Sequence, residues 1–370
     1  MLKLPEIFNL GINNMSGALV SLVAKGAQDV YLMNNDSESS FFKSKYTRYT
    51  NFAQTPKQLD FSGVVQNSGM TSIFITSHGD LINQVWLEGS NVVGNLSGTT
   101  FDLYIGGQII DSQTFDFMAD VWQIYMAETY SKCQTINNNI SQSNINFFPL
   151  HFFFCDNHMF LPLLALQYHQ IEIRIQWGPS IQNVANLTAY GNYIYLDTVE
   201  RDKFAQKPSD FLITQVQRIT GSTGSVDLSL LNHPVKSLYF GYPQTSNALQ
   251  YWKFTNASIT LNGNYLLENM TPTYFHTVQG YYHTEYGIIN FNMSQMAPTY
   301  TRYYTYNFCL DATSYKPTGT CNFSRLDNGK LQIVGATTAP GQTLTTLTIY
   351  AVNYNVLRIK SGVAGVLFSN

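Results

Sequence analysis

The sequence has few charged residues and no run of like charge. Lysine and arginine together number 20, aspartate and glutamate 23, and charged residues make up only 12% of the chain. A surface that packages nucleic acid needs clustered cations to release counterions, so we expect no direct contact with nucleic acid. Weak repulsion between molecules is also compatible with a protein that packs against copies of itself.

Segments that would direct the chain to a membrane or a secretory route are also missing. The first residues, MLKLPEIFNLGINNMSG, lack the pattern of a signal peptide, and no apolar run approaches ~18 residues. The four cysteines, Cys133, Cys155, Cys309 and Cys321, have neither CxxC nor ligand-like spacing. We therefore predict a chain made in the cytosol, with free, buried thiols.

Motifs of catalysis and metal binding are absent as well. No GxSxG, P-loop or dinucleotide fingerprint occurs. The closest histidines, His151, His158 and His169, have no HxH or HExxH spacing. Asp197 and Glu200 fit a helix cap better than a catalytic carboxylate pair. We predict no enzyme activity and no cofactor. A glycan-binding surface of tyrosines and asparagines in loops stays open as an alternative of another class.

What the sequence does contain is β structure. Aromatic residues make up 14% of the chain, and asparagine, serine and threonine are abundant, which suits strands joined by polar turns. The clearest strand follows Gln170, where Ile171, Ile173, Ile175 and Trp177 alternate with polar residues. This period of two predicts a half-buried strand.

Upstream of that strand lies a second alternating row. Phe148, Leu150, Phe152 and Phe154 are expected on one face, and Pro149 is tolerated at a strand start or edge. Between the two rows, residues 161–169 read LPLLALQYH, too short for a long helix and too apolar for an exposed loop. We expect this segment to close the end of a β-sandwich, with His169 hydrogen-bonded where it meets the strand.

Other elements are read from period and turn residues. In Asp80–Glu88, residues 81, 83, 85 and 87 are expected on one face and 82, 84, 86 and 88 on the other, with apolar residues on both. Residues 101–111 predict a hairpin that turns at Gly106-Gly107. Asp116–Lys132 has helical spacing with Asp116 as the cap, and Ser131–Asn146 reads as a loop.

The region after Phe147–Trp177, called the central stretch below, contains the best domain boundary. Gly178–Asn192 is expected to be a loop, Tyr193–Leu196 a strand, and Asp197–Gln206 a helix capped by Asp197 or Thr198. Beyond it the pattern repeats. The turn at Gly107 recurs at Gly263, and Ile194-Tyr195 recurs as Ile349-Tyr350. The two offsets, 156 and 155 residues, indicate a duplicated domain.

The N-terminal residues 1–44 are expected to form an arm. Gly17–Val23 is apolar but too short to insert stably into a membrane. Gly26–Leu32 is expected to carry a short strand.

At least six blocks of the sequence, in order, resemble the major capsid proteins of nucleocytoplasmic large DNA viruses. They include GALVSLVAKGAQDVYL, IGGQ-x-ID, LPLLALQYHQIEIRI, YIYLDTVERDKFAQ, LNHPVKSL, KPTGTCNFSRLD and IYAVNYNVLRI. Their central residues, called the signature residues below, are candidate site residues with a structural role: Gly106, Gly107, Gln108, Asp111, Leu161, Pro162, Leu166, Gln167, Tyr168, His169, Asp197, Glu200, Arg201, Asn232, His233, Pro234, Gly319, Cys321, Asn322, Phe323, Ser324, Arg325, Asn353, Tyr354, Asn355 and Arg358.

The resemblance implies an all-β fold of two tandem eight-stranded jelly-roll β-sandwiches with a few short helices. The arm would cover residues 1–44, the first jelly roll 45–206 and the second 207–370. It also implies a structural major capsid protein that trimerises into a pseudo-hexagonal capsomer and tiles the icosahedral shell of a large double-stranded DNA virus. Such a protein is located in the virion after assembly in the host cytoplasm.

The partners implied are further copies of the chain, neighbouring capsomers, and minor capsid and penton proteins. Trimer contacts are expected on the barrel walls and on Asp197–Gln206. The loops Ser131–Asn146, Gly178–Asn192 and Thr271–Ala297 would cap an outer face that could meet host glycans. Contact between the arm and an inner membrane stays open. Since the chain is short for this family, we expect trimmed loops and a flatter capsomer, with a minor capsid paralogue or assembly scaffold as the alternative.

Overall fold

The computed structural model describes residues 17–33, 42, 46–126, 145–156, 159–206, 209–222, 224–242, 252–284, 303–338, 344 and 346–368. The chain divides into two compact units, Met1–Thr50 and Asn51–Asn370. In the first unit, α1 spans Gly17–Val23 and η3, a 3-10 helix, spans Ala27–Tyr31. The strand expected at Gly26–Leu32 is therefore wrong, because the Asp29 carboxylate accepts the Gly26 N–H at 2.7 Å and stabilises a tight helical turn.

The second unit begins with two facing sheets formed by residues 52–196. One sheet has the order β1 (Phe52–Leu59), β10 (Thr188–Leu196), β4 (Leu81–Ser90), β7 (Ile145–Pro149), and β8 (Leu161–Pro162) also pairs with β4. The other has the order β2 (Phe61–Ser62), β3 (Met70–Ile75), β9 (Ile171–Gln176), β5 (Thr100–Ile105), β6 (Gln108–Thr114). Short helices lie between these strands, among them α2 (Val92–Asn95), η5 (Phe153–Cys155), η6 (Leu163–Ala165) and η7 (Ile181–Asn183).

Residues 209–366 build a second pair of sheets. One has the order β11 (Ser209–Gly221), β21 (Leu347–Lys360), β13 (Pro234–Gly241), β17 (Tyr303–Asn307), with β18 (Cys321–Asn322) paired to β13 and β22 (Val363–Val366) paired to β21. The other has the order β12 (Ser225–Asp227), β19 (Gly329–Val334), β15 (Asn256–Leu261), β16 (Asn264–Met270), and β14 (Trp252–Lys253) pairs with β20 (Thr337–Thr338). The 3-10 helix η9 spans Phe323–Arg325.

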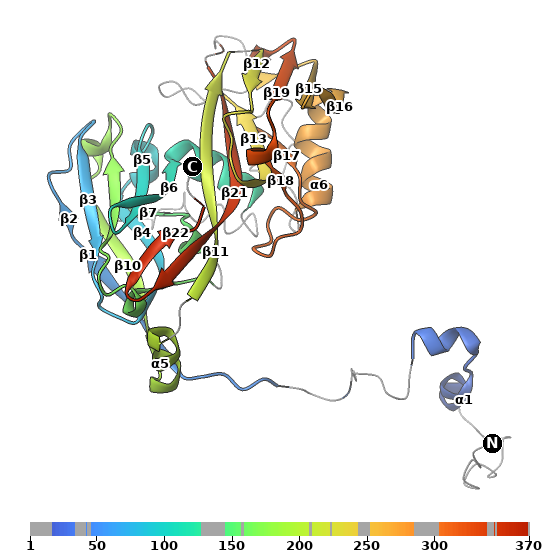
Figure 1. The fold of residues 1–370 in the computed structure, drawn as a ribbon, viewed down its shortest axis with the longest axis horizontal. Helices are drawn as coiled ribbons and strands as arrows, with labels where there is room; N and C mark the ends of the chain where they lie inside the picture. The colour runs from blue at the N-terminus through green and yellow to red at the C-terminus, as the bar shows by residue number, and fades with distance from the viewer. Residues whose placement is uncertain are drawn as a thin grey trace, which may run out of the picture. The chain divides into compact units, whose positions relative to one another are not determined.

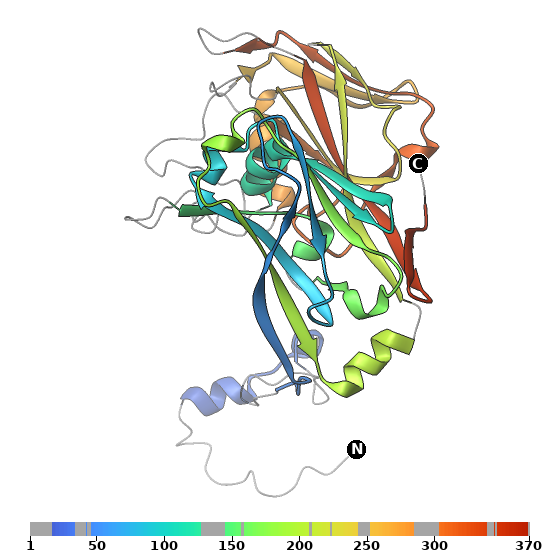
Figure 2. The same cartoon turned by 90° about the vertical axis from the view of Figure 1, so that its left-hand side faces the viewer.

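The strand order of the first half recurs in the second. The path β1-β10-β4-β7 corresponds to β11-β21-β13-β17, and β3-β9-β5-β6 corresponds to β12-β19-β15-β16. Each half is thus an eight-stranded jelly roll with additional short strands, which confirms the predicted fold class. Figures 1 and 2 show the two strand systems side by side, with α5 (Thr198–Gln206) between them in the chain. The domain limits 45–206 and 207–370 stay a prediction.

Both halves also contain a π-helical segment before their sixth principal strand. In the first half it is η4 (Phe117–Trp122), continued by α3 (Gln123–Tyr125), and in the second it is η8 (Tyr274–Val278), continued by α6 (Gln279–His283). The helix expected after Asp116 is therefore confirmed up to residue 125, and residues 127–132 lie outside the described ranges. Asp116 is not its cap, because its backbone is already helical and its side chain makes no capping bond.

Two predicted loops are wrong. Strand β10 begins at Thr188, inside the stretch 178–192 that was expected to be a loop, because its full length pairs with β1 and β4. Helices η8 and α6 occupy part of the loop expected at Thr271–Ala297. The tyrosines and threonines of this segment do not indicate a helix, but the segment forms one that packs on the sheet. Of the loop expected at 131–146, residues 145 and 146 belong to β7, and 131–144 lie outside the described residues.

The face assignment in β4 is also wrong, and a β-bulge explains why. Tyr193 pairs with Ile82 and Asn192 with Gln84, so Asn83 is an extra residue in its strand. The bulge shifts the side-chain phase by one position, which brings Ile82 into the core beside Val85 and Leu87.

An equivalent β-bulge lies in β13 and shows how the residues of the two halves align. Its extra residue is Lys236, between Val235 (paired with Asn353) and Ser237 (paired with Val352). Superposing the bulges makes Tyr190 the counterpart of Tyr350, since Tyr190 pairs with Trp86 and Tyr350 with Tyr239. The expected match of Tyr195 with Tyr350 is therefore wrong. The Gly107–Gly263 match is confirmed, because both glycines follow a left-handed residue in a two-residue hairpin turn.

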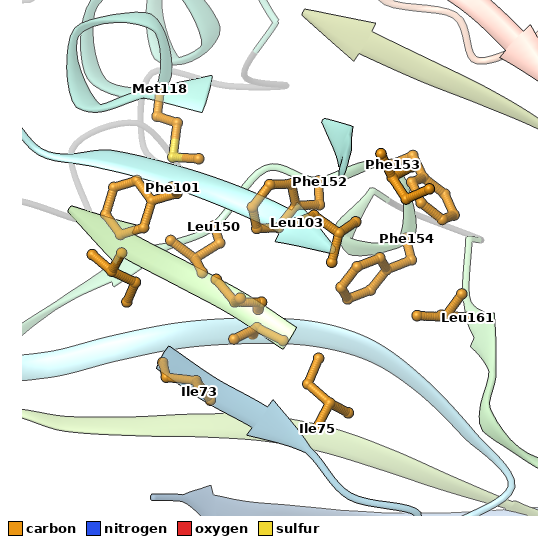
Figure 3. Packing of buried hydrophobic residues seen from close by; sticks show 14 of the residues in the cluster. Ile73, Ile75, Phe101, Leu103, Met118, Leu150, Phe152, Phe153, Phe154 and Leu161 are labelled. Carbon is orange, nitrogen blue, oxygen red and sulfur yellow. The ribbon is translucent and has the colours of Figure 1, made fainter. Parts of the chain in front are cut away.

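The core of the first half is aromatic and reaches into the central stretch. Figure 3 shows Leu103 of β5 beside Phe152 and Phe154, and Phe101 of the same strand beside Leu150. Phe148, Leu150, Phe152 and Phe154 are all buried as expected, but the alternation holds only to Phe152, because edge strand β7 ends at Pro149 and the turn into η5 buries Phe153 as well. The half-buried strand at 171–176 is confirmed.

Three further observations complete the fold. Cys155, Cys309 and Cys321 are free as predicted, but only Cys309 is fully buried, and Cys133 lies outside the described residues. No helix of the described ranges is long and apolar enough to span a bilayer. The apolar segment 161–166 closes the sandwich as expected, with Leu161, Leu163 and Leu166 in the core, whereas Tyr168 is 75% exposed.

Candidate functional site: the junction between the two jelly rolls

The two jelly rolls meet where the first half's helix packs on the second half's sheet. Phe117 of η4 lies with its ring centroid 5.4 Å from that of Tyr350 on β21, and Tyr125 of α3 lies 5.5 Å from Tyr239 on β13. The Tyr125 hydroxyl donates to the backbone oxygen of Tyr303 on β17 at 2.6 Å. Tyr239, Tyr303 and Tyr350 therefore belong to the core cluster of the first half although their strands belong to the second.

This contact buries the second half's sheet on both faces. Along β13, Tyr239 packs toward the first half, while its neighbours Leu238 and Phe240 pack into the second half's own core. Residues Leu347–Asn355 of β21 are all buried. A strand covered on both sides is apolar at every position instead of every second one.

A buried carboxylate bridges the halves beside this aromatic contact. One oxygen of Asp111, on β6, accepts the backbone N–H groups of Val216 on β11 at 2.9 Å and of Ser112 at 3.0 Å. The other oxygen accepts the Gln113 amide at 2.6 Å. Burial raises the pKa of Asp111 to about 7 despite these hydrogen bonds. Burial thus disfavours the charged form of the Asp111 carboxyl group, although both of its oxygens accept hydrogen bonds.

A row of amide side chains continues the junction along β11 and β21. Gln215 donates to the backbone oxygen of Ile110 in the first half and accepts from Asn355 at 2.9 Å. Gln217 binds the backbone N–H and oxygen of Asn232 at 2.9 and 2.7 Å, and donates to Asn353 at 2.9 Å. The signature residues Asn232, Asn353 and Asn355 therefore hold one network, as buried polar groups require.

A second contact involves the glycine turn and the C-terminal hairpin. The ring nitrogen Nδ1 of His169 accepts the Ala364 N–H at 3.1 Å, which confirms the hydrogen-bonded histidine. Tyr168 donates its backbone N–H to Gly362 at 3.0 Å. A Cβ on Gly106 would lie 2.3 Å from His169 Nδ1, so the turn needs glycine for space as well as for its φ of 58°. Three signature residues, Gly106, Tyr168 and His169, thus contact the β21–β22 hairpin or each other.

The signature residues of β18 and η9 form a separate cluster within the second half. His233, with φ of 64°, donates its N–H to the Ser324 hydroxyl at 2.8 Å and accepts from the Phe323 N–H at 3.1 Å. Asn322 caps η9 by accepting the Ser324 N–H, and it pairs with Pro234. The pairs Leu161-Pro162 and Cys321-Asn322 occupy equivalent places, because each lies opposite the residues beside its strand's bulge.

The signature residues of α5 form a further group. Asp197 directly precedes the helix and occupies its capping position as predicted, because its side chain accepts the Thr198 N–H at 2.8 Å and its backbone oxygen accepts the Arg201 N–H at 3.0 Å. Arg201 forms an ion pair with Asp80, Nε to Oδ1 at 3.1 Å, and the other oxygen of Asp80 accepts the Leu196 N–H at 2.9 Å. Glu200 is half-buried. This pair ties the helix to the end of β10.

Other signature residues are not brought into these groups. Arg358 forms a two-bond ion pair with Asp210 on the exposed side of β11 and β21. Gly319 packs beside the backbone of Phe308, Tyr354 lies near the buried Lys236, and Gln167 and Arg325 are exposed. Burial lowers the pKa of Lys236, whose ammonium lies 3.4 Å from the Ser314 backbone oxygen. Within the described ranges no cluster of three His, Cys, Asp or Glu side chains could hold a metal ion.

Sequence reasoning missed the residues that make the aromatic contact. Thr114, Tyr125 and Tyr239 belong to no signature block, yet they join the halves together with Phe117 and Tyr350. One signal was available, because Leu238–Phe240 on β13 and Ile349–Val352 on β21 are aliphatic or aromatic at successive positions and therefore indicate a sheet covered on both faces.

Comparisons with known proteins match this architecture over nearly the whole chain. A family described as "Large eukaryotic DNA virus major capsid protein" matches residues 200–365, and one described as "Major capsid protein N-terminus" matches residues 40–201. The major capsid protein of Pyramimonas orientalis virus is 33% identical over 96% of this chain and 100% of its own length. That of Paramecium bursaria Chlorella virus 1 is 32% identical over the same shares. A solved chain from the quasi-atomic model of the PBCV-1 virus capsid superposes with a TM-score of 0.75 at 27% identity, covering 90% of this chain and all of that one.

Proposed function

The chain belongs to the family of large eukaryotic DNA virus major capsid proteins, and from this membership we propose that it is a structural subunit of a virion shell. The observation that carries this is the 33% identity along the whole of a relative that is a major capsid protein. The fold supports the same role, because two stacked jelly rolls give rigid walls with most strand edges paired.

The subunit acts as a homotrimer whose six jelly rolls form a pseudo-hexagonal capsomer. Support comes from the internal repeat, since two similar sandwiches in one chain give three chains six similar corners. Closed rotational symmetry is the usual way for identical subunits to satisfy every interface. Its partners are then neighbouring capsomers and minor capsid and penton proteins, with assembly in the host cytoplasm.

A structural role accounts for the side chains found at the junction. Asp111, Gln215 and Asn355 use their polar atoms in hydrogen bonds that hold the halves together. We propose that the chain has no catalytic activity and needs no cofactor. The outer loops remain candidates for contact with host glycans.

The test is the mass of the purified full chain by light scattering over a dilution series. A species of three chains that survives dilution is expected, followed by packing into hexagonal arrays at high concentration. A monomer at every concentration would contradict the capsomer and favour a binding module, to be checked by glycan titration. Trimers that never form arrays would favour the minor paralogue or scaffold.

A further inference from the structure

We propose that α6 of one chain docks on the outer face of β4, β10 and β7 of a second copy, so that the contact between chains repeats the junction within the chain. This inference rests on the proposed function, because it assigns the surface through which copies associate. The contact agrees with the expectation of contacts on the barrel walls and differs from it only in naming α6 in place of Asp197–Gln206.

The starting observation is an asymmetry between two equivalent sheets. In the second half, the outer face of β21-β13-β17 is covered by η4 and α3 of the first half. In the first half, the outer face of β10-β4-β7 keeps a burial pattern that alternates, with one face in the core and the other partly open. Within the described residues, the outer face of this sheet is therefore covered by helices in the second half and uncovered in the first half.

The uncovered face presents the counterparts of the buried aromatic residues. When Asn83 of the β4 bulge is aligned with Lys236 of the β13 bulge, Trp86 corresponds to Tyr239, and their strand partners Tyr190 and Tyr350 correspond to each other. Phe147 pairs with Glu88, and Tyr303 pairs with Gly241 at the equivalent position, so Phe147 corresponds to Tyr303. We call Trp86, Phe147 and Tyr190 the aromatic face.

Trp86 and Tyr190 of the aromatic face point away from the core, whereas Phe147 is partly buried and also packs against the core cluster of the first half. The strand neighbours of the three members, Leu87, Phe148 and Ala189, are each 0% exposed in the core. Trp86, Phe147 and Tyr190 are half-buried, and the rings of Trp86 and Tyr190 are stacked at a centroid distance of 5.6 Å. Stacked aromatic residues on one side of a sheet form a rigid apolar surface of the kind found at the centres of interfaces.

The second half contains a helix, α6, that corresponds to α3 of the first half. The π-helices begin at Phe117 and at Tyr274, an offset of 157 residues, so Tyr282 of α6 corresponds to Tyr125 of α3. Tyr125 is 2% exposed against the sheet that it covers, whereas Tyr281 and Tyr282 are 75% and 71% exposed. Their rings meet edge to face at 4.9 Å. Two adjacent exposed tyrosines on a short helix are typical anchors of a protein interface.

The aromatic face and α6 cannot meet within one chain. Figure 1 shows α6 at one side of the molecule and β4 at the other, with the second half's strands between them. A second copy can bring them together, and the resulting contact is head-to-tail. Head-to-tail contacts close into a ring when the rotation permits. In that ring, junctions within chains and junctions between chains alternate, as a pseudo-hexagonal block requires.

Cysteine cross-linking of the full chain tests the contact directly. Because Tyr125 lies beside Tyr239 within the chain, Tyr282→Cys should lie beside Trp86→Cys of the next copy. Mild oxidation of the double variant is expected to give covalent dimers and trimers on a denaturing gel. Each single variant, which keeps the native cysteines, is the control and should stay monomeric on the gel. A trimeric double variant without cross-links beyond those of the single variants would overturn the proposal and leave the capsomer intact.

Loss of the tyrosine anchors is the second test. The variant Y281S/Y282S should raise the concentration below which trimers dissociate by about tenfold or more, since buried aromatic anchors carry much of an interface's affinity. Tyr265→Ser, at a 58% exposed tyrosine of β16, is the matched control and should leave the mass unchanged. Equal trimer stability in the two variants would contradict the docking of α6. A wild-type chain that is monomeric would instead overturn the capsomer and this contact together.

Discussion

The Asp111 carboxylate on β6 accepts the backbone N–H of Val216 on β11 at 2.9 Å, across 105 residues of sequence. The bond joins the two jelly rolls through a buried group whose pKa is raised by burial to about 7. Hydrogen bonds from Val216, Gln113 and Ser112 favour the ionised form but do not offset the loss of water around it.

The first prediction concerns pH. In the unfolded chain Asp111 ionises near the ordinary pKa of 3.8, so between about pH 4 and 7 the folded chain binds more protons than the unfolded one. The free energy of unfolding should therefore fall as pH rises through this window, by on the order of a few kcal/mol from this group. Urea denaturation at several values between pH 5 and pH 8 measures the slope.

In D111N that slope should flatten, because the neutral amide has no charge to desolvate. Asp227→Asn is the control, since Asp227 is exposed and hydrogen bonds from Ser229 lower its pKa, which places its effect at more acidic pH. An unchanged slope in D111N would show that other groups produce the pH dependence.

The second prediction concerns the hydroxyl pair of the junction. Thr114 Oγ1 and the Tyr350 hydroxyl lie 2.7 Å apart on opposite halves. Tyr350→Phe keeps the ring contact with Phe117 and removes this bond, and should lower the free energy of unfolding by about 1 kcal/mol. Thermal unfolding or urea titration measures it. Tyr265→Phe, on an exposed part of β16, should change stability very little, and an equal loss in both variants would contradict the assignment.

The third prediction compares two neighbouring glycines. Gly106 and Gly107 both have positive φ, 58° and 81°, so alanine at either position adds backbone strain of about 1 kcal/mol. Only at Gly106 would the new Cβ meet another residue, His169 at 2.3 Å, whereas nothing lies within 4 Å at Gly107. G106A should therefore be less stable than G107A by roughly 1–3 kcal/mol. Denaturant midpoints of the two variants decide it, and equal midpoints would exclude the close approach of His169.

The fourth prediction concerns the attachment of α5. Asp80 serves both the Arg201 side chain and the Leu196 N–H, and its side chain is 10% exposed, whereas that of Arg201 is 62% exposed. Asp80→Ala leaves the Leu196 N–H unpaired and should cost about 1–3 kcal/mol. Arg201→Ala removes only an exposed partner and should cost about 1 kcal/mol or less.

Urea titration of both variants, with Asp202→Ala as an exposed control, provides the comparison. A larger loss in Arg201→Ala than in Asp80→Ala would show that the ion pair, and not the backbone bond, holds the helix.

Local sequence patterns predicted much of the fold. The alternation from Gln170 to Trp177 led to β9, and the Gly106-Gly107 turn led to the β5–β6 hairpin. The errors lie where local pattern and packing disagree. Asn83 looks like any strand residue, yet the bulge there moves Ile82 to the other face. Tyr274–His283 has poor helix formers, and its packing on the sheet decides its conformation.

The candidate site was predicted less completely than the fold. The signature residues include Asp111, His169, Asn353 and Asn355, which the structure brings to the junction. The partners Gln215 and Gln217, and Tyr125 of the aromatic contact, were missed, because nothing in their own neighbourhoods distinguishes them from ordinary strand and helix residues.

By itself the sequence determined the clearest strands, the glycine turns, the duplication and the family, because each depends on neighbours along the chain or on blocks that can be compared directly. Tertiary structure alone decided which face of each sheet is covered. Tyr190 and Tyr350 occupy equivalent strand positions, but Tyr350 is buried and Tyr190 is half-exposed. The difference arises because η4, more than 200 residues away in sequence from Tyr350, packs on one sheet and not on the other, and such a contact is set by the arrangement of whole layers.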